Sequence, residues 1–245
     1  MKIMGVDISS RSTGWSIIED NKLLVYGKIM PSGKTMTNAQ KMYLFQGELR
    51  KIIDDKQPDE IAIEDVVQVR SVSVLKLLAR FNGIAIIEAY RCMQKEPELY
   101  EPSRWKSAID GCTGSSKKAE VQNSICKKYN KLSFEKFSIY KKRIDEAKEM
   151  IQNSGDSIKH EIKDSKKQLK KANKNKLPNN EIFIIEQKIK SLQEKLIANK
   201  KNDKKGISDA FDKISIDIYT ETGINDDIAD SIGVAIAHQK QLEKK

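Results

Sequence analysis

The sequence predicts an α/β protein with a mixed five-stranded sheet flanked by helices and an antiparallel helical hairpin inserted into it. Two observations support this prediction. Residues 1–130 alternate short apolar runs, typical of buried strands, with longer segments whose apolar residues recur every three or four positions, typical of helices. Residues 131–206 then become lysine-rich and glycine-poor while keeping the helical period.

Three consecutive strands are predicted at the start of the chain. Residues 2–8, 14–19 and 23–29 are short apolar segments joined by polar turns, the second of which lies near Glu19 to Lys22. Because such short turns join neighbouring strands that run in opposite directions, these segments form an antiparallel meander.

The remaining elements alternate between helix and strand before the chain becomes wholly helical. The predicted order is a helix at 37–56, a strand at 60–63, a helix at 71–94, a short strand at 98–101, helices at 103–109 and from 116 onward, and a final helix from about residue 225. This order predicts a mixed sheet with helices on both faces.

The inserted segment carries two narrow apolar seams at coiled-coil spacing. The seams consist of Ile158, Ile162, Leu169 and Ala172, with Ser165 filling one step, and of Ile182, Ile185, Ile189, Leu192 and Leu196. A turn is predicted at 177–180, where Pro178 cannot continue a helix, and a break at 153–156. The arms 156–177 and 179–202 would reach ~35 Å at 1.5 Å per residue. The predicted domains are therefore 1–130 with 207–245, and the hairpin 131–206.

The charge is concentrated in one part of the chain. The net charge is +10, yet residues 127–205 hold 23 Lys and Arg against 11 Asp and Glu, so the rest is close to −2. A basic segment on a nearly neutral body is typical of a protein with a polyanionic partner such as DNA. A solvated helix in a lysine-rich composition is the alternative.

Composition narrows the class of protein further. The 245 residues suffice to bury a proper core, and we find neither a signal peptide nor an apolar run long enough to span a bilayer. Cys92, Cys112 and Cys126 are scattered and lack metal-ligand spacing, so we interpret them as reduced thiols of a cytoplasmic protein that has no membrane partner.

Four carboxylates in three separated places are the candidate active-site residues. Asp7 and Glu64 each end an apolar strand-like run, and Asp227 and Asp230 lie three residues apart on one face of the final helix. Carboxylates that converge repel each other unless a cation lies among them, and oxygen ligands without Cys or His favour Mg²⁺ or Mn²⁺. The pattern predicts phosphodiester chemistry.

Four segments of the chain resemble the RuvC-type Holliday junction resolvases. The run GVDISSRSTG at 5–14 is similar to the family's first motif, roughly G-I-D-P-G-S-R-x-T-G, with Ile8 and Ser9 in place of Pro and Gly. IAIE at 61–64 resembles the second motif, and DIADSIGVAI at 227–236 resembles the D-A-A-D-A-L-A-x-A-I helix. The stretch 114–121 is similar to the family's G-x-x-x-K-x-x-V.

The resemblance implies a ribonuclease H-like fold and two-metal hydrolysis that leaves a 5′ phosphate and a 3′ hydroxyl. Asp7 would bridge two Mg²⁺ ions, Mn²⁺ being an acceptable substitute, and Glu64, Asp227 and Asp230 would complete the metal shells. Lys118 would offset charge that develops at the phosphate, with Lys117 as its alternative. The neighbouring Asp226 is interpreted as a helix cap.

Further roles follow from the resemblance. Lys106 falls where the family places a basic residue that contacts DNA. Trp105 is interpreted as a core residue in preference to a residue that stacks on a nucleobase. His238 is interpreted as a packed helix residue. The residues predicted to contact DNA are Arg11, Arg70, Lys106, Lys117 and Lys118.

The chain departs from the family after the second motif. Some members carry an aromatic side chain three residues after the second-motif glutamate, and this side chain stacks on a base at the junction centre. Here Val67 occupies that position, so Val69, Arg70 or the inserted arm would have to compensate.

The family's homodimers present two matched sites to a four-way junction. The candidate interface here is the helix 71–94, although burial against its own sheet accounts for at least half of these side chains: Val72, Leu75, Leu78, Ala79, Ala85 and Ile86.

Three other functions are compatible with parts of the sequence. A nuclease specific for flaps, forks or R-loops, or a transposon-type nuclease core, would keep the fold and change the substrate. A non-cleaving junction-binding protein would have no use for four intact acids. An actin-like kinase or ATPase would need a second glycine-rich phosphate turn, which we do not find.

Overall fold

The computed structural model describes residues 1–31, 35–67, 71–153, 156–174 and 178–244. The chain divides into two compact units: Met1–Lys141 with Ser215–Lys245, and Lys142–Ile214. The second unit thus begins after the predicted residue 131 and ends beyond the predicted residue 206. The domain limits taken from the sequence remain a prediction.

The first unit contains a five-stranded mixed sheet with the strand order β3-β2-β1-β4-β5. Its strands are β1 (Lys2–Asp7), β2 (Thr13–Glu19), β3 (Lys22–Ile29), β4 (Glu60–Glu64) and β5 (Glu98–Tyr100). The first three strands pair antiparallel, while β4 runs parallel to both β1 and β5. The predicted α/β fold of the ribonuclease H-like kind is confirmed.

The turn between β2 and β3 lies where the sequence predicts it. Asp20 and Asn21 have φ values of 47° and 62°. Two residues in the left-handed region form the tight hairpin turn that matches the twist of antiparallel strands, and Asp and Asn tolerate this region better than most residues do. Local chemistry therefore sets the register of the meander.

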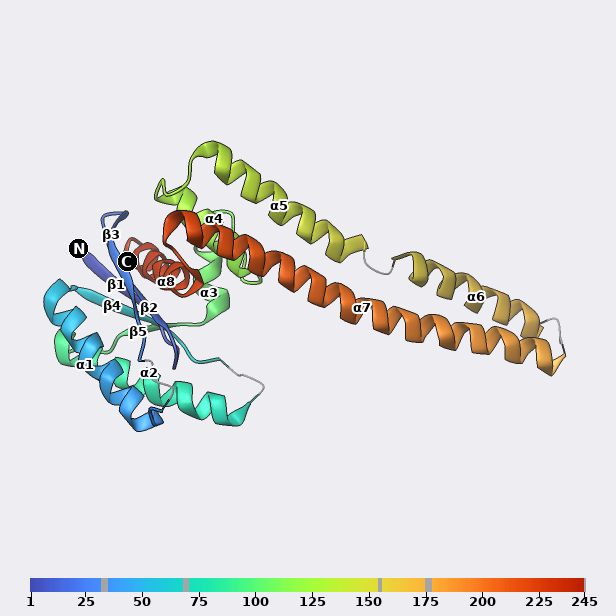
Figure 1. The fold of residues 1–245 in the computed structure, drawn as a ribbon, viewed down its shortest axis with the longest axis horizontal. Coiled ribbons are helices and arrows are strands. Elements are labelled where there is room, and N and C mark those ends of the chain that lie inside the picture. The colour runs from blue at the N-terminus through green and yellow to red at the C-terminus, as the bar shows by residue number, and fades with distance from the viewer. Residues whose placement is uncertain (32–34, 68–70, 154–155, 175–177, 245) are drawn as a thin grey trace. The chain divides into compact units, whose positions relative to one another are not determined.

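Two helices, α1 (Asn38–Lys56) and α2 (Val72–Met93), cover one face of the sheet (Figure 1). Thr37 caps α1 in a reciprocal capping box with Gln40. The rings of Phe45 and Phe81 pack with their centroids 5.2 Å apart, which joins the two helices in the core. This face therefore forms the main apolar core.

A buried carboxylate also links α1 to α2. The fully buried Glu88 side chain accepts hydrogen bonds from Arg50 at 2.7 and 2.9 Å, from Gln46 at 2.8 Å and from Arg91 at 3.0 Å. Its hydrogen bond with Arg50 is the main cause that lowers the pKa of Glu88 to about 2. Glu88 is therefore a charged structural residue.

The opposite face of the sheet is covered by α8 (Asp226–Leu242), which packs on β1 and β2, with α3 (Pro102–Ser107) and α4 (Lys118–Lys128) against it. The helix approaches the sheet closely at two glycines. A Cβ on Gly5 would lie 2.0 Å from the Ser231 carbonyl oxygen, and one on Gly14 would lie 2.0 Å from that of Asp227. Glycine at both positions therefore lets the start of α8 reach the ends of β1 and β2.

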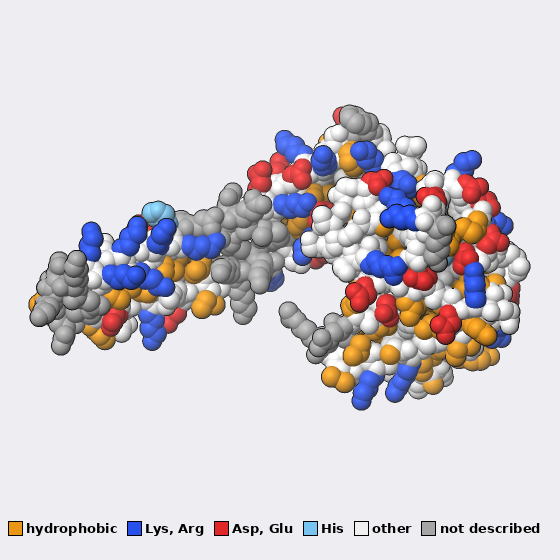
Figure 2. All heavy atoms as spheres, turned by 180° about the vertical axis from the view of Figure 1, so that it is seen from behind, with side chains coloured by type: hydrophobic (Ala, Val, Ile, Leu, Met, Phe, Trp, Pro, Cys, Tyr) orange, Lys and Arg blue, Asp and Glu red, His pale blue; other side chains and the backbone are white. Residues whose placement is uncertain are grey.

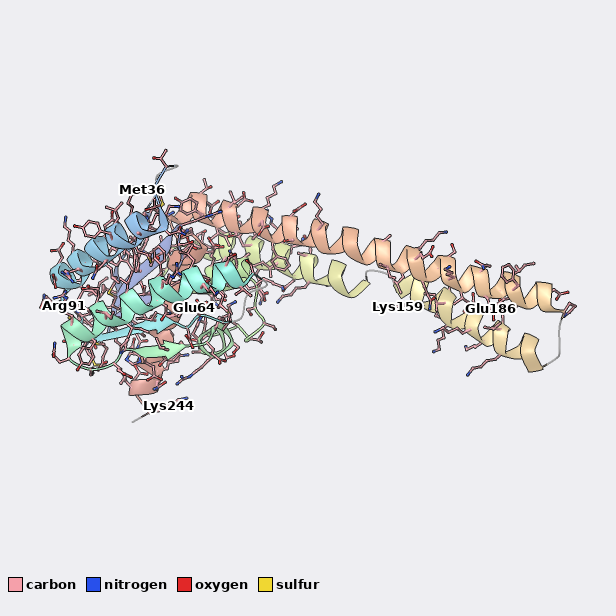
Figure 3. All side chains as sticks on the ribbon, turned by 90° about the horizontal axis from the view of Figure 1, so that it is seen from below. Met36, Glu64, Arg91, Lys159, Glu186 and Lys244 are labelled. Carbon is pink, nitrogen blue, oxygen red and sulfur yellow. The ribbon has the colours of Figure 1, made fainter. Side chains whose placement is uncertain are left out.

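The second unit is helical. The chain from α5 (Phe134–Asn153) continues into α6 (Asp156–Lys174) and α7 (Asn179–Thr222), and α6 runs alongside α7 in Figures 1 and 3. Residues 154–155 of the predicted break at 153–156 and residues 175–177 of the predicted turn lie outside the described residues, so both stay predictions. Ser165, Ile189 and Leu192 of the predicted seams are buried. None of the described helices is long and apolar enough to cross a membrane.

The predicted end of the second arm near residue 202 is wrong, because α7 is 44 residues long and ends at Thr222. No proline follows Pro178, and the helical period resumes with the buried Phe211, Ile214 and Ile218. The helix ends where Gly223, at φ 70°, donates its N–H to the Tyr219 carbonyl.

Candidate active site

Two acidic residues stand at adjacent strand ends. Asp7 is the last residue of β1 and Glu64 the last residue of β4. These strands are parallel neighbours in which Val6 pairs with Ile63, so both carboxylates emerge at the same edge of the sheet. Figure 3 labels Glu64 at this edge.

The third acidic residue comes from α8. The Asn225 side chain accepts a hydrogen bond from the Ile228 N–H at 3.0 Å and so fixes where the helix begins. Asp230 then faces the strand ends from the first turns. Among the described residues, Asp7, Glu64 and Asp230 form a group whose ligand oxygens all lie within 4.8 Å of one another.

Burial raises the pKa of all three carboxyl groups, and repulsion by neighbouring acids adds to the rise for Asp7 and Asp230. Burial raises the pKa of Asp7 well above its usual value, and the charges of Glu64 and Asp230 raise it further. Burial also raises the pKa of Glu64 to about 7, with the Lys106 charge opposing the rise. The pKa of Asp230 is raised by burial and then by Glu64, again against Lys106.

Two of the carboxylate oxygens are closed off from solvent without a partner. Glu64 Oε2 and Asp230 Oδ1 accept no hydrogen bond from any of the described residues, which is costly for a buried polar atom. The nearby Trp105 lowers the pKa of Glu64 and so favours its charged form. The Trp105 Nε1 and Glu64 Oε2 atoms do not, however, form a hydrogen bond with each other. Convergent oxygens that lack donors fit a hard divalent cation.

Asp227 lies beside this group but outside it. Its Oδ2 accepts hydrogen bonds from Ser12 Oγ at 2.6 Å and from Asn225 Nδ2 at 3.1 Å. Its charge still contributes to the raised pKa of Asp7. A metal-binding role for Asp227 therefore remains a prediction, and Ser12 and Asn225 both orient its side chain.

The interpretation of Asp226 as the helix cap is wrong. Asn225 caps α8, because an Asn side chain at this position can accept from the third N–H of the helix. Asp226 instead forms an ion pair with the Lys118 ammonium group, which comes from the first residue of α4.

The predicted cations lie at different distances from the acids. Lys106 and Lys118 are close enough for their charges to lower the pKa of Asp230. Lys117 and Arg11 are exposed, and Arg70 and Val69 lie outside the described residues. Val67 is exposed, at 42% of its surface. DNA contacts by all these residues remain predictions.

Two residues behave as interpreted from the sequence. Trp105 is fully buried and packs against Gly233 of α8, where an added Cβ would lie 2.6 Å from the indole ring. His238 is 5% exposed, with Nδ1 3.2 Å from the Tyr100 hydroxyl and Nε2 3.5 Å from Glu60. Neither side chain is available to stack on a base.

Sequence reasoning missed two polar residues of the site, Ser12 and Asn225. The signal for Asn225 was present, because an Asn directly before two acids and an apolar helix is a typical N-cap. Ser12 had no such local signal, since its partner Asp227 lies 215 positions away.

The fold and the convergent carboxylates define the class: a ribonuclease H-like α/β protein with a candidate divalent-metal site at the carboxyl ends of β1 and β4. A sequence model described as crossover junction endodeoxyribonuclease RuvC matches residues 3–135, more than half of the chain. The chain belongs to this family of nucleases, and the resemblance seen in its motifs is confirmed.

Proteins named crossover junction endodeoxyribonuclease RuvC are similar to about half of this chain. That of Finegoldia magna is 32% identical over 131 residues, which cover 51% of this chain and 77% of the relative. That of Acidobacterium capsulatum is 31% identical over 139 residues, covering 52% and 79%. The solved Thermus thermophilus RuvC has a TM-score of 0.46 at 16% identity, covering 53% of this chain and 81% of that one.

The family match includes Asp7 and Glu64 and ends before the second unit and α8. Asp230 is therefore connected to the other two acids by the tertiary structure, independently of that match. The helices α6 and α7 lie beyond the matched residues altogether.

Proposed function

We propose that this chain is a structure-selective DNA endonuclease that resolves Holliday junctions by paired symmetric nicks. The proposal is supported above all by the group of Asp7, Glu64 and Asp230, whose oxygens lie within 4.8 Å of one another in a chain of the RuvC family. The products are a 5′ phosphate and a 3′ hydroxyl.

Asp7, Glu64 and Asp230 would hold two Mg²⁺ ions, with Asp227 completing a shell and Mn²⁺ as an alternative ion. When bound, such ions activate water and stabilise the departing 3′ oxygen. The protein supplies the rest: a sheet edge that fixes Asp7 beside Glu64, and a capped helix that fixes Asp230. Ser12 and Asn225 orient Asp227 through the hydrogen bonds that it accepts.

Lys118 is the proposed cation at the scissile phosphate. Its ammonium group is held by Asp226 at the edge of the acid group, so it is positioned without being buried. Lys106 lies close enough to influence both Glu64 and Asp230, and its proposed role is to contact a neighbouring phosphate of the cut strand. Arg11 and Lys117, both exposed, would contact the DNA further out.

A homodimer would supply the two sites that paired nicks require. Of the six α2 side chains predicted at the interface, Val72 and Ala79 are exposed, Leu75, Leu78 and Ile86 are half-buried, and Ala85 is buried. The surface of α2 also exposes Ile87 and Tyr90 at 64% and 50%. Solvent-facing apolar residues on one helix support a partner on this face.

The test uses a labelled four-way junction with Mg²⁺ and the matched variant Asp7→Asn. Paired symmetric nicks by the wild-type protein that the variant loses would support both the chemistry and the substrate. A panel of forks, flaps, R-loops and plain duplexes of equal length defines selectivity. Preferred cutting of forks or flaps would replace junction resolution by the broader branched-DNA activity, and tight junction binding without cutting would leave a junction-binding protein.

A further inference from the structure

The two arms of the hairpin differ in charge. Helix α6 (Asp156–Lys174) contains seven lysines against three acids, while the opposing segment 179–198 of α7 contains three lysines against three acids. Helix α6 therefore carries a net charge of +4 and this segment of α7 none, while Lys200 and Lys201 bring the whole second arm, 179–202, to +2. A lysine-rich composition alone would spread the excess over both arms.

The lysines of α6 follow the helical period. Lys159, Lys163, Lys166 and Lys170 recur at steps of four, three and four, which places them on one side of the helix. All four are exposed, and with Ile162 and Lys167 they line one shallow groove. We call these lysines, Lys167 included, the α6 ridge. Figure 2 shows Lys and Arg side chains gathered along the hairpin.

Three of the five ridge lysines have no ion-pair partner among the described residues. Lys167 lies 3.6 Å from Asp164, which also pairs with His160 at 3.1 Å. No carboxylate among the described residues is within ion-pair distance of Lys163, Lys166 or Lys170. Like charges three or four residues apart destabilise a helix. A polyanion bound along the ridge would remove this repulsion.

The chemistry of the ridge favours a nucleic acid backbone over a protein. Protein interfaces have cores rich in aromatic residues and poor in Lys, whereas the described residues that line this groove are five lysines and the half-buried Ile162. Lysine binds phosphate as a point charge and reads no base by itself. The ridge therefore fits a partner whose phosphates repeat and whose sequence is not read.

The dimensions of the ridge agree with this partner. Lys159 and Lys170 are eleven residues apart, about 16 Å along the helix axis at 1.5 Å per residue. Each strand of duplex DNA places a phosphate about every 3.4 Å of its axis, so roughly five phosphates of one strand span the same length. A ridge of five lysines matches that number.

We propose that the α6 ridge binds the sugar–phosphate backbone of a duplex DNA arm without reading its sequence. This inference rests on the proposed function, because the duplex arm would belong to the branched substrate. It assigns a partner to the part of the chain that the family match does not include.

The experiment measures binding of the full chain to a labelled linear duplex and to a four-way junction, without divalent metal, over a series of salt concentrations. Two variants with the same change in net charge are compared. The ridge variant carries Lys163→Gln, Lys166→Gln and Lys170→Gln, and the control variant carries Lys188→Gln, Lys190→Gln and Lys195→Gln on α7.

The wild-type logarithm of affinity should fall steeply with the logarithm of salt concentration. Each lost phosphate contact makes that slope shallower by about 0.9, so the ridge variant should lose up to about 2.7 from it. The loss should be the same for duplexes of unrelated sequence. The control variant should change the slope much less, and replacing the three ridge lysines by arginine should restore it.

An unchanged slope in the ridge variant, or equal losses in both glutamine variants, would overturn the proposal. Circular dichroism checks that the three proteins are equally helical, and the single variant Lys166→Gln, with an expected loss of up to about 0.9 in the slope, remains a test if the triple variant misfolds. An assay of junction cutting distinguishes a failure of this proposal from a failure of the proposed nuclease function. Wild-type protein that nicks no branched DNA while the ridge variant still loses its salt slope contradicts the proposed function alone.

Discussion

The two units of the molecule use charge in opposite ways. The first unit brings three acidic side chains together at half-buried positions, where Glu64 and Asp230 raise the pKa of Asp7 and Glu64 raises that of Asp230. The second unit spaces like charges along an exposed helix face, where water screens them. Crowded buried acids are suited to holding an ion and to chemistry, and spaced exposed cations are suited to long, weakly specific contact.

The two arrangements of charge also differ in their effect on the stability of the fold. Buried carboxylates without donors lower the stability of the metal-free fold, and the surrounding core must compensate for them. The Phe45–Phe81 contact and the Glu88 interactions with Arg50 and Arg91 lie in the same unit as the acids. The lysines of α6 make no comparable demand because they stay in water.

The largest expected effect tests whether the acids are catalytic. Asp7→Asn should lower the rate of junction nicking by at least about 10³-fold, since metal-assisted charge stabilisation is worth several kcal/mol and each 1.4 kcal/mol is tenfold. The metal-free variant should nevertheless melt at a higher temperature than the wild type, because one buried charge is gone. Nicking rates and thermal melts measure the two effects, and a variant that is both slow and less stable would contradict this account.

The second prediction concerns pH. The pKa of Glu64 rises from its ordinary 4.5 to about 7 in the fold, so the native state holds more protons than the unfolded chain between these values. Stability of the metal-free protein should therefore fall as pH rises through that window. Melting temperatures at a series of pH values measure it. Mg²⁺ or Glu64→Gln should flatten the dependence, and the same slope in Glu64→Gln would assign it to other groups.

The third prediction concerns the structural carboxylate of the same unit. Glu88→Gln should lower the free energy of unfolding by about 1–3 kcal/mol, since charge-assisted hydrogen bonds to a buried group are lost. The pKa of Glu88 is depressed to about 2, so its contribution is present above pH 4.5 and is lost as pH falls toward 2. Urea unfolding at neutral and acid pH measures this. An equal difference from wild type at both extremes would contradict it.

The smallest expected effect concerns the residue that orients Asp227. Ser12→Ala removes one of the two hydrogen bonds to its Oδ2, and the nicking rate should fall by about fivefold to tenfold, equivalent to ~1 kcal/mol. Ser12→Thr, which keeps the hydroxyl, is the control. A loss as large as that of Asp7→Asn would place Asp227 among the primary metal-binding residues.

The sequence by itself determined which segments are strands and helices. The meander, the helices on each side of β4 and the start of α8 all follow from local patterns of apolar, polar and turn residues. It also supplied Asp7, Glu64 and Asp230 as candidates, because acids at strand ends and helix starts are local features.

Only the tertiary structure decided which acids meet. Asp227 binds Ser12 and Asn225, Asp226 pairs with Lys118, and Asp230 joins Asp7 and Glu64, although the three aspartates lie within five residues of one another. Local pattern cannot separate them, since the outcome depends on how closely α8 approaches Gly5 and Gly14 of the sheet. Local sequence patterns also could not predict the full length of α7, because the burial of Phe211 and Ile218 stabilises the helix beyond the glycine at 206.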